Sequence, residues 1–382
     1  MSVLTNMPFD FEKEYGVVLE GGGAKGSYQI GVWKAMQEYG VKIRAVAGVS
    51  VGALNGALMC MGDLQKAEDI WKTISFSDVM DVDDEIMRAL MDGKLKDIDF
   101  REAGKHLVQV LGNRGLDISP LRRLIADTLQ EDIIRQSPTD LFIGTFDVMK
   151  MSEVEININD IEEGTLADYL IASASLPVFK NELLQGRRYL DGGMVNNVPI
   201  NLLIDRGYKD IIVIRIFGTG HEKRVDIPED VNIIEIKPSV NLGNMLNFNS
   251  KIAQKNMNCG YYDGIRLFEG LAGQKYYIRT QENSERHYME RLIETGEWLK
   301  EIIVEDYLLS EEKGSFERQL FEIVFPSLAI EQKLGRDWDY RELYFQMLEV
   351  YAQRMHIQKY KVYTEEELAE KVKNKIKDKL HI

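Results

Sequence analysis

The chain has 382 residues, with 62 acidic and 47 basic side chains and a formal net charge of −15 at pH 7. This charge repels polyphosphate backbones, so we expect no nucleic-acid partner, and only a local patch would attract an anionic membrane. Two cysteines, Cys60 and Cys259, are too few for a disulfide framework. We expect them to be reduced, which suits a cytoplasmic protein.

The N-terminal residues 1–16 lack the basic region and the apolar run of a signal peptide. No stretch of the sequence reaches about 18 consecutive apolar residues, so no membrane-spanning helix is expected. The sequence therefore predicts a cytoplasmic protein whose only membrane contact would be peripheral. The oligomeric state stays open.

Strand and helix signals alternate along the N-terminal part of the chain. Residues 15–20 form a short apolar run that ends in three glycines, which is typical of a buried strand. Residues 27–39 carry apolar side chains at helical spacing, and residues 43–47 and 51–61 repeat the strand and helix patterns. Helices are also expected to begin at Ser119 and Pro199. Further strands are expected at residues 141–147, 153–158, 188–190, 211–216 and 233–236.

This alternation predicts a mostly parallel central sheet with helices on both faces, which is a three-layer α/β/α sandwich. Strand signals stop after Arg279, and residues 284–306 and 316–380 show helical patterns. We therefore expect a first domain over residues 1–305 and a C-terminal α-helical region over residues 306–382.

Gly48-Val49-Ser50-Val51-Gly52 fits the pattern G-x-S-x-G between a predicted strand and a predicted helix. Such a serine serves as a nucleophile when a sharp strand-to-helix turn exposes its hydroxyl, and Gly48 and Gly52 would let the backbone crowd there. The alternative is a tight turn with a structural serine. The position between a strand and an apolar helix favours the nucleophile.

Gly21-Gly22-Gly23-Ala24-Lys25-Gly26 also lies between a predicted strand and a predicted helix. It fits the dinucleotide fingerprint G-x-G-x-x-G, but no acidic residue ends the second strand as that site requires. It also lacks the G-K-[ST] ending of a P-loop. An oxyanion loop is the remaining interpretation, because this loop and the serine follow neighbouring strands at one edge of the sheet.

Asp191-Gly192-Gly193 follows another predicted strand, where an acidic residue suits an exposed turn or, beside a nucleophilic serine, a base. Combined with the two glycine-rich motifs, with Ala-Ser-Ala-Ser-Leu-Pro at residues 172–177 and with Asn196, Asn197 and Pro199, this motif resembles the patatin-like phospholipase family. The resemblance covers roughly residues 14–270 and leaves the C-terminal helical region outside.

The resemblance implies a lipid acyl hydrolase of the phospholipase A or lysophospholipase type in the first domain. It implies Ser50 as the nucleophile and Asp191 as the base of a dyad without histidine, which acts through an acyl-serine intermediate. The substrate would be a lipid or lysolipid ester, and no metal or cofactor would be needed. The implied oxyanion hole comprises Gly21, Gly22, Gly23, Ala24, Lys25 and Gly26, with supporting turns at Gly48, Gly52, Gly192 and Gly193.

Several alternatives stay open. An esterase of the α/β-hydrolase type would add a histidine after Asp191, and His221 and His287 have that order, although the fold places its serine later in the chain. A non-catalytic lipid-binding protein would keep the same fold. Lys25 would support the loop, face a lipid phosphate or be solvated. No histidine stands in a motif: His106, His221, His287, His356 and His381.

Two helices are candidates for lipid contact. A helix that begins at Asp83 carries a methionine-rich face, which would form a lid over the site or pack in the core. Its apolar residues and their neighbours are Phe76, Val79, Met80, Ile86, Met87, Leu90 and Met91. The tail helix, residues 365–380, has a regular apolar stripe among lysines, and it would lie on an anionic bilayer or pack on its own protein.

Overall fold

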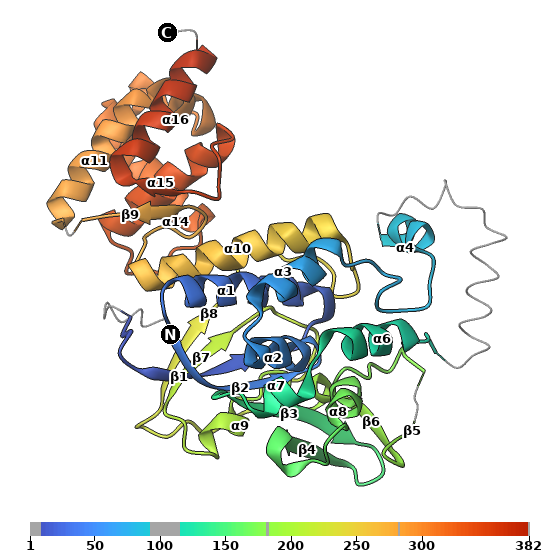
Figure 1. Cartoon of the computed structure of the whole chain (residues 1–382). Coiled ribbons are helices and arrows are strands. Elements are labelled where there is room, and N and C mark those ends of the chain that lie inside the picture. The colour runs from blue at the N-terminus through green and yellow to red at the C-terminus, as the bar shows by residue number, and fades with distance from the viewer. Residues whose placement is uncertain (1–8, 92–114, 181–182, 282, 381–382) are drawn as a thin grey trace. The chain divides into compact units, whose positions relative to one another are not determined.

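The computed structural model describes residues 9–91, 115–180, 183–281 and 283–380 (Figure 1). The chain divides between Ile265 and Arg266 into two compact units. This division lies within α10 (Ser250–Glu269), well before residue 305. The reason is a short pair of strands, β9 (Tyr277–Arg279) and β10 (Val362–Thr364), which binds the residues just after α10 to the C-terminal unit.

An eight-stranded sheet forms the centre of the N-terminal unit, in the order β5-β6-β3-β2-β1-β7-β8, with β4 paired to β3. The parallel strands are β1 (Glu14–Leu19), β2 (Lys42–Val49), β3 (Asp140–Asp147), β7 (Asp210–Ile214) and β8 (Asn232–Ile236). The antiparallel strands at one side are β4 (Ser152–Asn157), β5 (Leu183–Leu184) and β6 (Arg187–Asp191). The predicted mostly parallel sheet is therefore confirmed.

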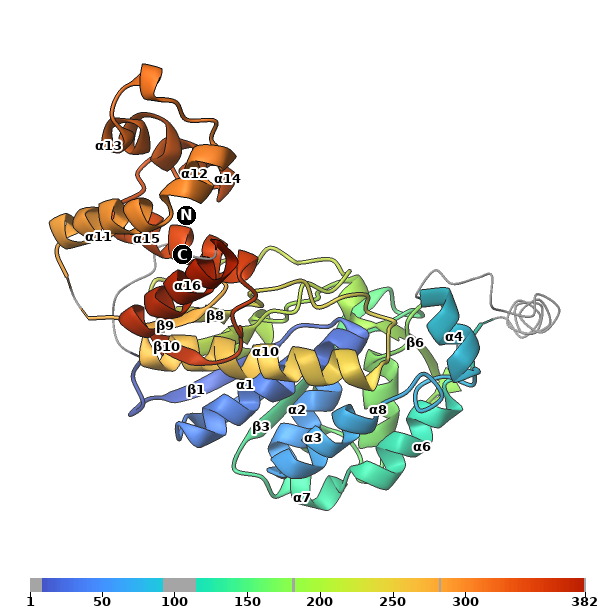
Figure 2. The same cartoon turned by 90° about the horizontal axis from the view of Figure 1, so that it is seen from above.

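Helices cover both faces of this sheet, which explains why its central strands are apolar on both sides. On one face, α2 packs closely on the sheet, since a side chain at Gly56 would meet Val46 and Leu141. On the other face, Leu202 and Leu203 of α9 pack against β1, β2 and β7. Figures 1 and 2 show α1, α3 and α10 on the side of α2. The predicted three-layer α/β/α sandwich is confirmed.

The helices predicted over residues 27–39 and 51–61 and from Ser119 are confirmed, whereas α3, α7, α8 and α10 had no predicted bounds. The long ones, α1 and α10, meet at backbone contact, because a Cβ atom at Gly31 would lie 1.8 Å from the Met257 carbonyl oxygen. The others are shorter. Besides α10, the α-helices in the described part of this unit are α1 (Ser27–Glu38), α2 (Val51–Met61), α3 (Leu64–Thr73), α4 (Asp84–Met91), α6 (Ser119–Thr128), α7 (Glu131–Arg135), α8 (Leu166–Ser173) and α9 (Asn201–Ile204).

The C-terminal unit is mostly helical, as predicted, and has a core of its own. The tail helix places Leu368, Val372 and Ile376 in that core, so its apolar stripe packs on its own unit. No described helix of the chain is both long and apolar enough to cross a membrane. The helices are α11 (Glu285–Trp298), α12 (Lys300–Asp306), α13 (Phe316–Gln319), α14 (Phe325–Glu331), α15 (Tyr340–Arg354) and α16 (Glu365–Leu380).

Candidate active site

Ser50 lies at the sharp turn between β2 and α2, in a conformation that few residues other than glycine adopt. Its backbone angles are φ 53° and ψ −130°. Such a conformation costs about 1–3 kcal/mol and persists only when the surroundings enforce it. A Cβ atom at Gly48 would lie 2.4 Å from the carbonyl carbon of Gly52, and one at Gly52 would lie 2.3 Å from the Leu19 carbonyl oxygen, so both positions exclude a side chain.

The C-terminal end of α8 and the residues just after it hold Ser50 and Asp191 in place. The Ser50 N–H donates to Ser173 Oγ at 2.9 Å, and the Ser173 hydroxyl donates to the Gly144 carbonyl at 2.6 Å. Two residues later, the Ser175 carbonyl accepts a 2.8 Å hydrogen bond from the Asp191 N–H. The motif at residues 172–177 thus gains a structural role that its sequence alone does not reveal.

Asp191 ends β6 and is 3% exposed. Its Oδ1 accepts a 2.8 Å hydrogen bond from the Gly193 N–H, whereas Oδ2 has no partner of hydrogen-bond geometry among the described residues. Burial raises the pKa of Asp191 to about 6, against the opposing effects of the nearby Ser50 hydroxyl and the Gly193 N–H. The carboxylate is therefore a stronger base than an ordinary aspartate.

Gly192 and Gly193 form the tight turn after Asp191. A Cβ atom at Gly192 would lie 2.4 Å from the Gly144 carbonyl oxygen, and one at Gly193 would lie 2.4 Å from Asn197 Oδ1. Both positions therefore exclude a side chain. The turn lets the Gly193 N–H reach back to the carboxylate that precedes it.

The glycine loop reaches the serine directly, because a Cβ atom at Gly21 would lie 3.3 Å from Ser50 Cβ. Three of its N–H groups are already engaged: those of Gly21, Ala24 and Lys25 donate to the carbonyls of Asn197, Met245 and Gly22. The N–H groups of Gly22 and Gly23 have no acceptor among the described residues. Gly26 lies farther along, where a Cβ atom would meet Val51 at 2.4 Å.

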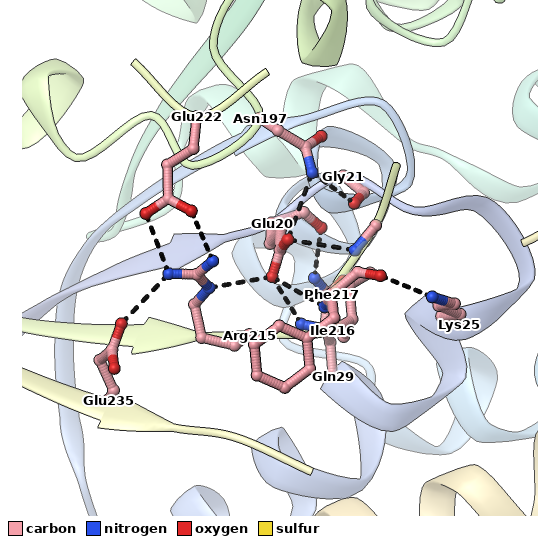
Figure 3. Close-up of polar contacts among 11 residues, drawn as sticks. Glu20, Gly21, Lys25, Gln29, Asn197, Arg215, Ile216, Phe217, Glu222 and Glu235 are labelled. Atoms are coloured by element: carbon pink, nitrogen blue, oxygen red, sulfur yellow. Dashed lines mark hydrogen bonds and ion pairs between the residues drawn. The ribbon is translucent and has the colours of Figure 1, made fainter. Parts of the chain in front are cut away.

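A buried acidic residue, Glu20, stands directly before the glycine loop and was missed by the sequence analysis (Figure 3). Glu20 is 2% exposed, and its carboxylate accepts hydrogen bonds from the Arg215 side chain and from the backbone N–H groups of residues 216–218. Asn197 also donates to it, at 3.3 Å. The signal in the sequence was a charge at the end of an otherwise apolar run.

An almost wholly apolar cavity opens beside Ser50. Of the residues assigned either to a lid or to core packing, Phe76 and Met80 pack in the core, and Val79 is a buried part of the cavity wall. Residues 92–114, including His106, lie outside the described residues. The wall includes Val51, Leu54, Leu58, Ile70, Trp71, Ile74, Leu121, Leu124, Ile125, Leu129, Leu176, Phe179, Leu246 and Phe248.

Within the N-terminal unit, no described histidine side chain is hydrogen-bonded to Ser50 or Asp191. The side chain of His221 is exposed, and only its backbone bonds to this region, through Asn197 and Gly193. His287 belongs to the C-terminal unit, where its Nε2 lies 3.9 Å from Glu365. In the described part of the chain, no three His, Cys, Asp or Glu side chains are arranged to hold a metal ion.

Comparison with known proteins identifies the class to which this fold and site belong. Residues 17–204 match the model of the family described as patatin-like phospholipase. This part of the chain belongs to the patatin-like phospholipase family, which confirms the resemblance drawn from the four motifs. At the level of that family, it is a lipid acyl hydrolase domain.

Two curated relatives are neuropathy target esterase sws of Drosophila melanogaster and of Drosophila persimilis. The first is 29% identical over 228 residues, which are 55% of this chain and 14% of the relative. The second is 30% identical over 213 residues, 51% of this chain and 13% of the relative. The chain therefore spans a small part of the length of these relatives. The crystal structure of VipD from Legionella pneumophila aligns over 89% of this chain and 84% of that chain, with a TM-score of 0.41 and 13% identity.

Proposed function

We propose that this protein hydrolyses carboxylic esters of lipids, with Ser50 as the nucleophile and Asp191 as its base. One observation carries the proposal: a serine in a strained turn lies beside a buried aspartate of raised pKa, at the edge of an apolar cavity. The domain would act on phospholipids or lysophospholipids. The name of the relatives, neuropathy target esterase, agrees with ester hydrolysis.

The reaction would proceed in two steps. Ser50 Oγ attacks the ester carbonyl as Asp191 takes its proton, and the tetrahedral intermediate carries its negative charge toward the N–H groups of Gly22 and Gly23. The intermediate then expels the alcohol, which takes the proton from Asp191 and leaves an acyl-serine. Water attacks the acyl group in the same way, which releases the fatty acid and restores Ser50.

The raised pKa of Asp191 supports its role as a base. An ordinary aspartate is about 2.6 pKa units less basic than histidine, which corresponds to about 3.5 kcal/mol of driving force for taking the serine proton. A pKa of about 6 removes most of that deficit. The unpaired Oδ2 leaves one side of the carboxylate available for the proton.

The cavity supports a fatty acyl chain as the bound part of the substrate. Its wall presents almost only apolar atoms, and burying methylene groups there contributes about 0.8 kcal/mol for each. With the acyl chain bound in the cavity, the ester carbonyl would lie next to Ser50 at the edge of the cavity. A triad enzyme is disfavoured, because neither Ser50 nor Asp191 has a histidine partner among the described residues.

Labelling by a fluorophosphonate, joined to a lipid-panel assay, tests this function. We expect the wild-type protein to be labelled at Ser50 and to release fatty acid from at least one phospholipid or lysophospholipid, as detected by mass spectrometry. Ser50→Ala should abolish both signals, whereas Ser152→Ala, at an exposed serine, should retain them. A wild-type protein that is folded but resists labelling would be a lipid-binding protein instead.

A further inference from the structure

We infer that Glu20 is a positioning residue for the oxyanion loop, which it fixes through the segment Arg215–Gly218. This inference rests on the proposed hydrolase function and deepens it. The carboxylate of Glu20 would hold the N–H groups of Gly22 and Gly23 at the place where negative charge develops. Glu20 itself would touch neither the substrate nor the reacting atoms.

The carboxylate of Glu20 binds four consecutive residues after β7 (Figure 3). Its Oε2 accepts from the N–H groups of Ile216 and Phe217 at 2.7 and 3.1 Å, and from Arg215 Nε at 3.1 Å. Its Oε1 accepts from the Gly218 N–H at 3.1 Å. Only an ionised carboxylate offers acceptors on both sides for such a convergent set of donors.

The segment held by Glu20 is in backbone contact with the glycine loop. A Cβ atom at Gly218 would lie 1.9 Å from the Gly21 carbonyl oxygen, and one at Gly22 would lie 3.2 Å from Gly218 Cα. The two backbone segments therefore pack directly against each other at Gly218, without room for a side chain there. A displacement of the segment would therefore move Gly22 as well.

Lys25 makes a second attachment from the other end of the loop. Its Nζ donates to the Phe217 carbonyl at 2.5 Å, so Glu20 binds the N–H of Phe217 and Lys25 binds its carbonyl. Of the three roles open to Lys25, loop support is the one that its contact favours. Gly22 and Gly23 thus lie in the sequence between Glu20 and Lys25, whose oppositely charged side chains both hydrogen-bond to the backbone of Phe217.

Asn197 links this arrangement to the turn that carries Asp191. Its Nδ2 donates to Glu20 Oε1 at 3.3 Å and to the Gly21 carbonyl at 3.1 Å, and its own carbonyl accepts from the Gly21 N–H. The glycine loop is therefore held at three places around Gly22 and Gly23. Donors that are fixed before the reaction stabilise the transition state without reorganisation.

The chain offers matched controls for Glu20. Arg215 also donates to Glu222 and Glu235, whose side chains are partly exposed and for which no hydrogen bond to the amides of residues 216–218 is found in the described structure. Substituting either one removes a carboxylate from the same guanidinium. Only Glu20→Gln also disturbs the hydrogen bonds that the backbone N–H groups of residues 216–218 donate to a carboxylate.

The test compares Glu20→Gln, Glu222→Gln and Glu235→Gln with the wild type on a p-nitrophenyl ester. A small misplacement of catalytic donors can cost about 100-fold in rate. We expect Glu20→Gln to lower kcat about tenfold to 100-fold with KM within about threefold, while the two controls stay within about twofold. An alkyl trifluoromethyl ketone, which forms a tetrahedral adduct with serine, should lose affinity in parallel with kcat. The alcohol of the same chain length should bind as before.

The outcomes separate this inference from the proposed function. If the wild type is labelled by a fluorophosphonate at Ser50 but Glu20→Gln keeps its kcat, the inference is wrong and the function stands. The inference is also wrong if ketone and alcohol lose affinity equally, or if Glu222→Gln matches Glu20→Gln. Should Glu20→Gln fail to fold, Lys25→Met supplies the decision: a drop in kcat and in ketone affinity supports the inference, and an unchanged kcat overturns it.

Discussion

Two buried carboxylates near Ser50, those of Glu20 and Asp191, differ in how fully their oxygens are hydrogen-bonded. On the side of the glycine loop, Glu20 is 2% exposed and accepts hydrogen bonds from five described donors. On the side of β6, Asp191 is 3% exposed, and apart from the nearby Ser50 hydroxyl its carboxylate has one described hydrogen bond, from the Gly193 N–H to Oδ1. Full satisfaction immobilises a carboxylate and its neighbours, whereas an unsatisfied oxygen keeps a carboxylate basic. In the proposed mechanism, one buried carboxylate, Glu20, would position the glycine loop, and the other, Asp191, would act as the base.

Removing either reacting group should give the largest effect. We expect Ser50→Ala and Asp191→Asn each to lower kcat on a p-nitrophenyl ester by about 10⁴-fold, since the proposed mechanism places both in the same proton transfer. The double variant should be no worse than Ser50→Ala alone, because the aspartate has nothing to activate once the serine is gone. Circular dichroism checks that each variant is folded. Multiplicative losses in the double variant would show that the two residues act independently.

Asp191→Asn should also make the protein more stable at neutral pH. The pKa of Asp191 is raised from 3.8 to about 6, so ionising it costs the folded state about 3 kcal/mol, at 1.36 kcal/mol for each pH unit. That cost appears as pH rises from about 4 to about 6 and remains above it. Thermal melts at pH 4 and pH 8 measure the effect. The variant should match the wild type at pH 4 and melt higher at pH 8.

Asp147→Asn is the matched control for this stability gain. Asp147 is also buried, but its oxygens accept from Met149 N–H, Lys150 N–H and Arg187. Loss of its charge should therefore lower the melting temperature at pH 8. If both variants melted higher, removal of any buried charge would explain the result, and the special position of Asp191 would not.

The pH dependence of hydrolysis should report the same aspartate. Only ionised Asp191 accepts the serine proton, so kcat/KM should rise about tenfold per pH unit below about pH 6 and level off above it. His221→Ala and His287→Ala should keep this profile and remain within about tenfold of wild-type activity, about 1.4 kcal/mol in barrier. A folded histidine variant that lost a thousandfold in activity would favour a triad.

The sequence predicted some of these site residues and missed others. The Ser50 and Asp191 motifs were accessible because each depends on residues close together in the chain. Glu20 was counted as the last residue of a buried strand, yet β1 ends at Leu19, and the partners of the Glu20 carboxylate lie beyond residue 196. A local pattern does not carry such distant contacts.

The boundary between the units escaped the sequence analysis for a similar reason. Strands β9 and β10 have three residues each, too short to show any period, and they pair across a long stretch of helices. A hydrophobic pattern counted over a short stretch of sequence cannot reveal pairing between two segments that lie far apart in the chain. The roles of Ser50, Asp191 and the oxyanion loop remain predictions that the experiments above decide.

The cavity should determine which acyl chains are hydrolysed. Leu124 of α6 is a half-buried part of its wall, so Leu124→Trp would shorten the space available to a chain. We expect kcat/KM for a p-nitrophenyl ester of twelve carbons to fall about tenfold relative to that of a four-carbon ester. Leu183→Trp, at a residue that is 63% exposed and outside the cavity wall, should leave the ratio unchanged. An equal fall for both esters would place the acyl chain elsewhere.

The smallest effect is expected from a third buried carboxylate, Glu349 in the C-terminal unit. It resembles Asp191 in that Oε1 accepts backbone hydrogen bonds, from Lys275 and Tyr276, while Oε2 has no partner among the described residues. Burial also raises the pKa of Glu349. No serine is seen to donate to it in the described structure, so its basicity has nothing to activate. Glu349→Gln should leave kcat within about twofold, while thermal unfolding becomes less sensitive to rising pH, because ionisation no longer penalises the folded state. A large loss of hydrolysis in Glu349→Gln would show that a buried carboxylate without a neighbouring serine also affects activity. The contrast between Glu20 and Asp191 would then not explain the role of Asp191.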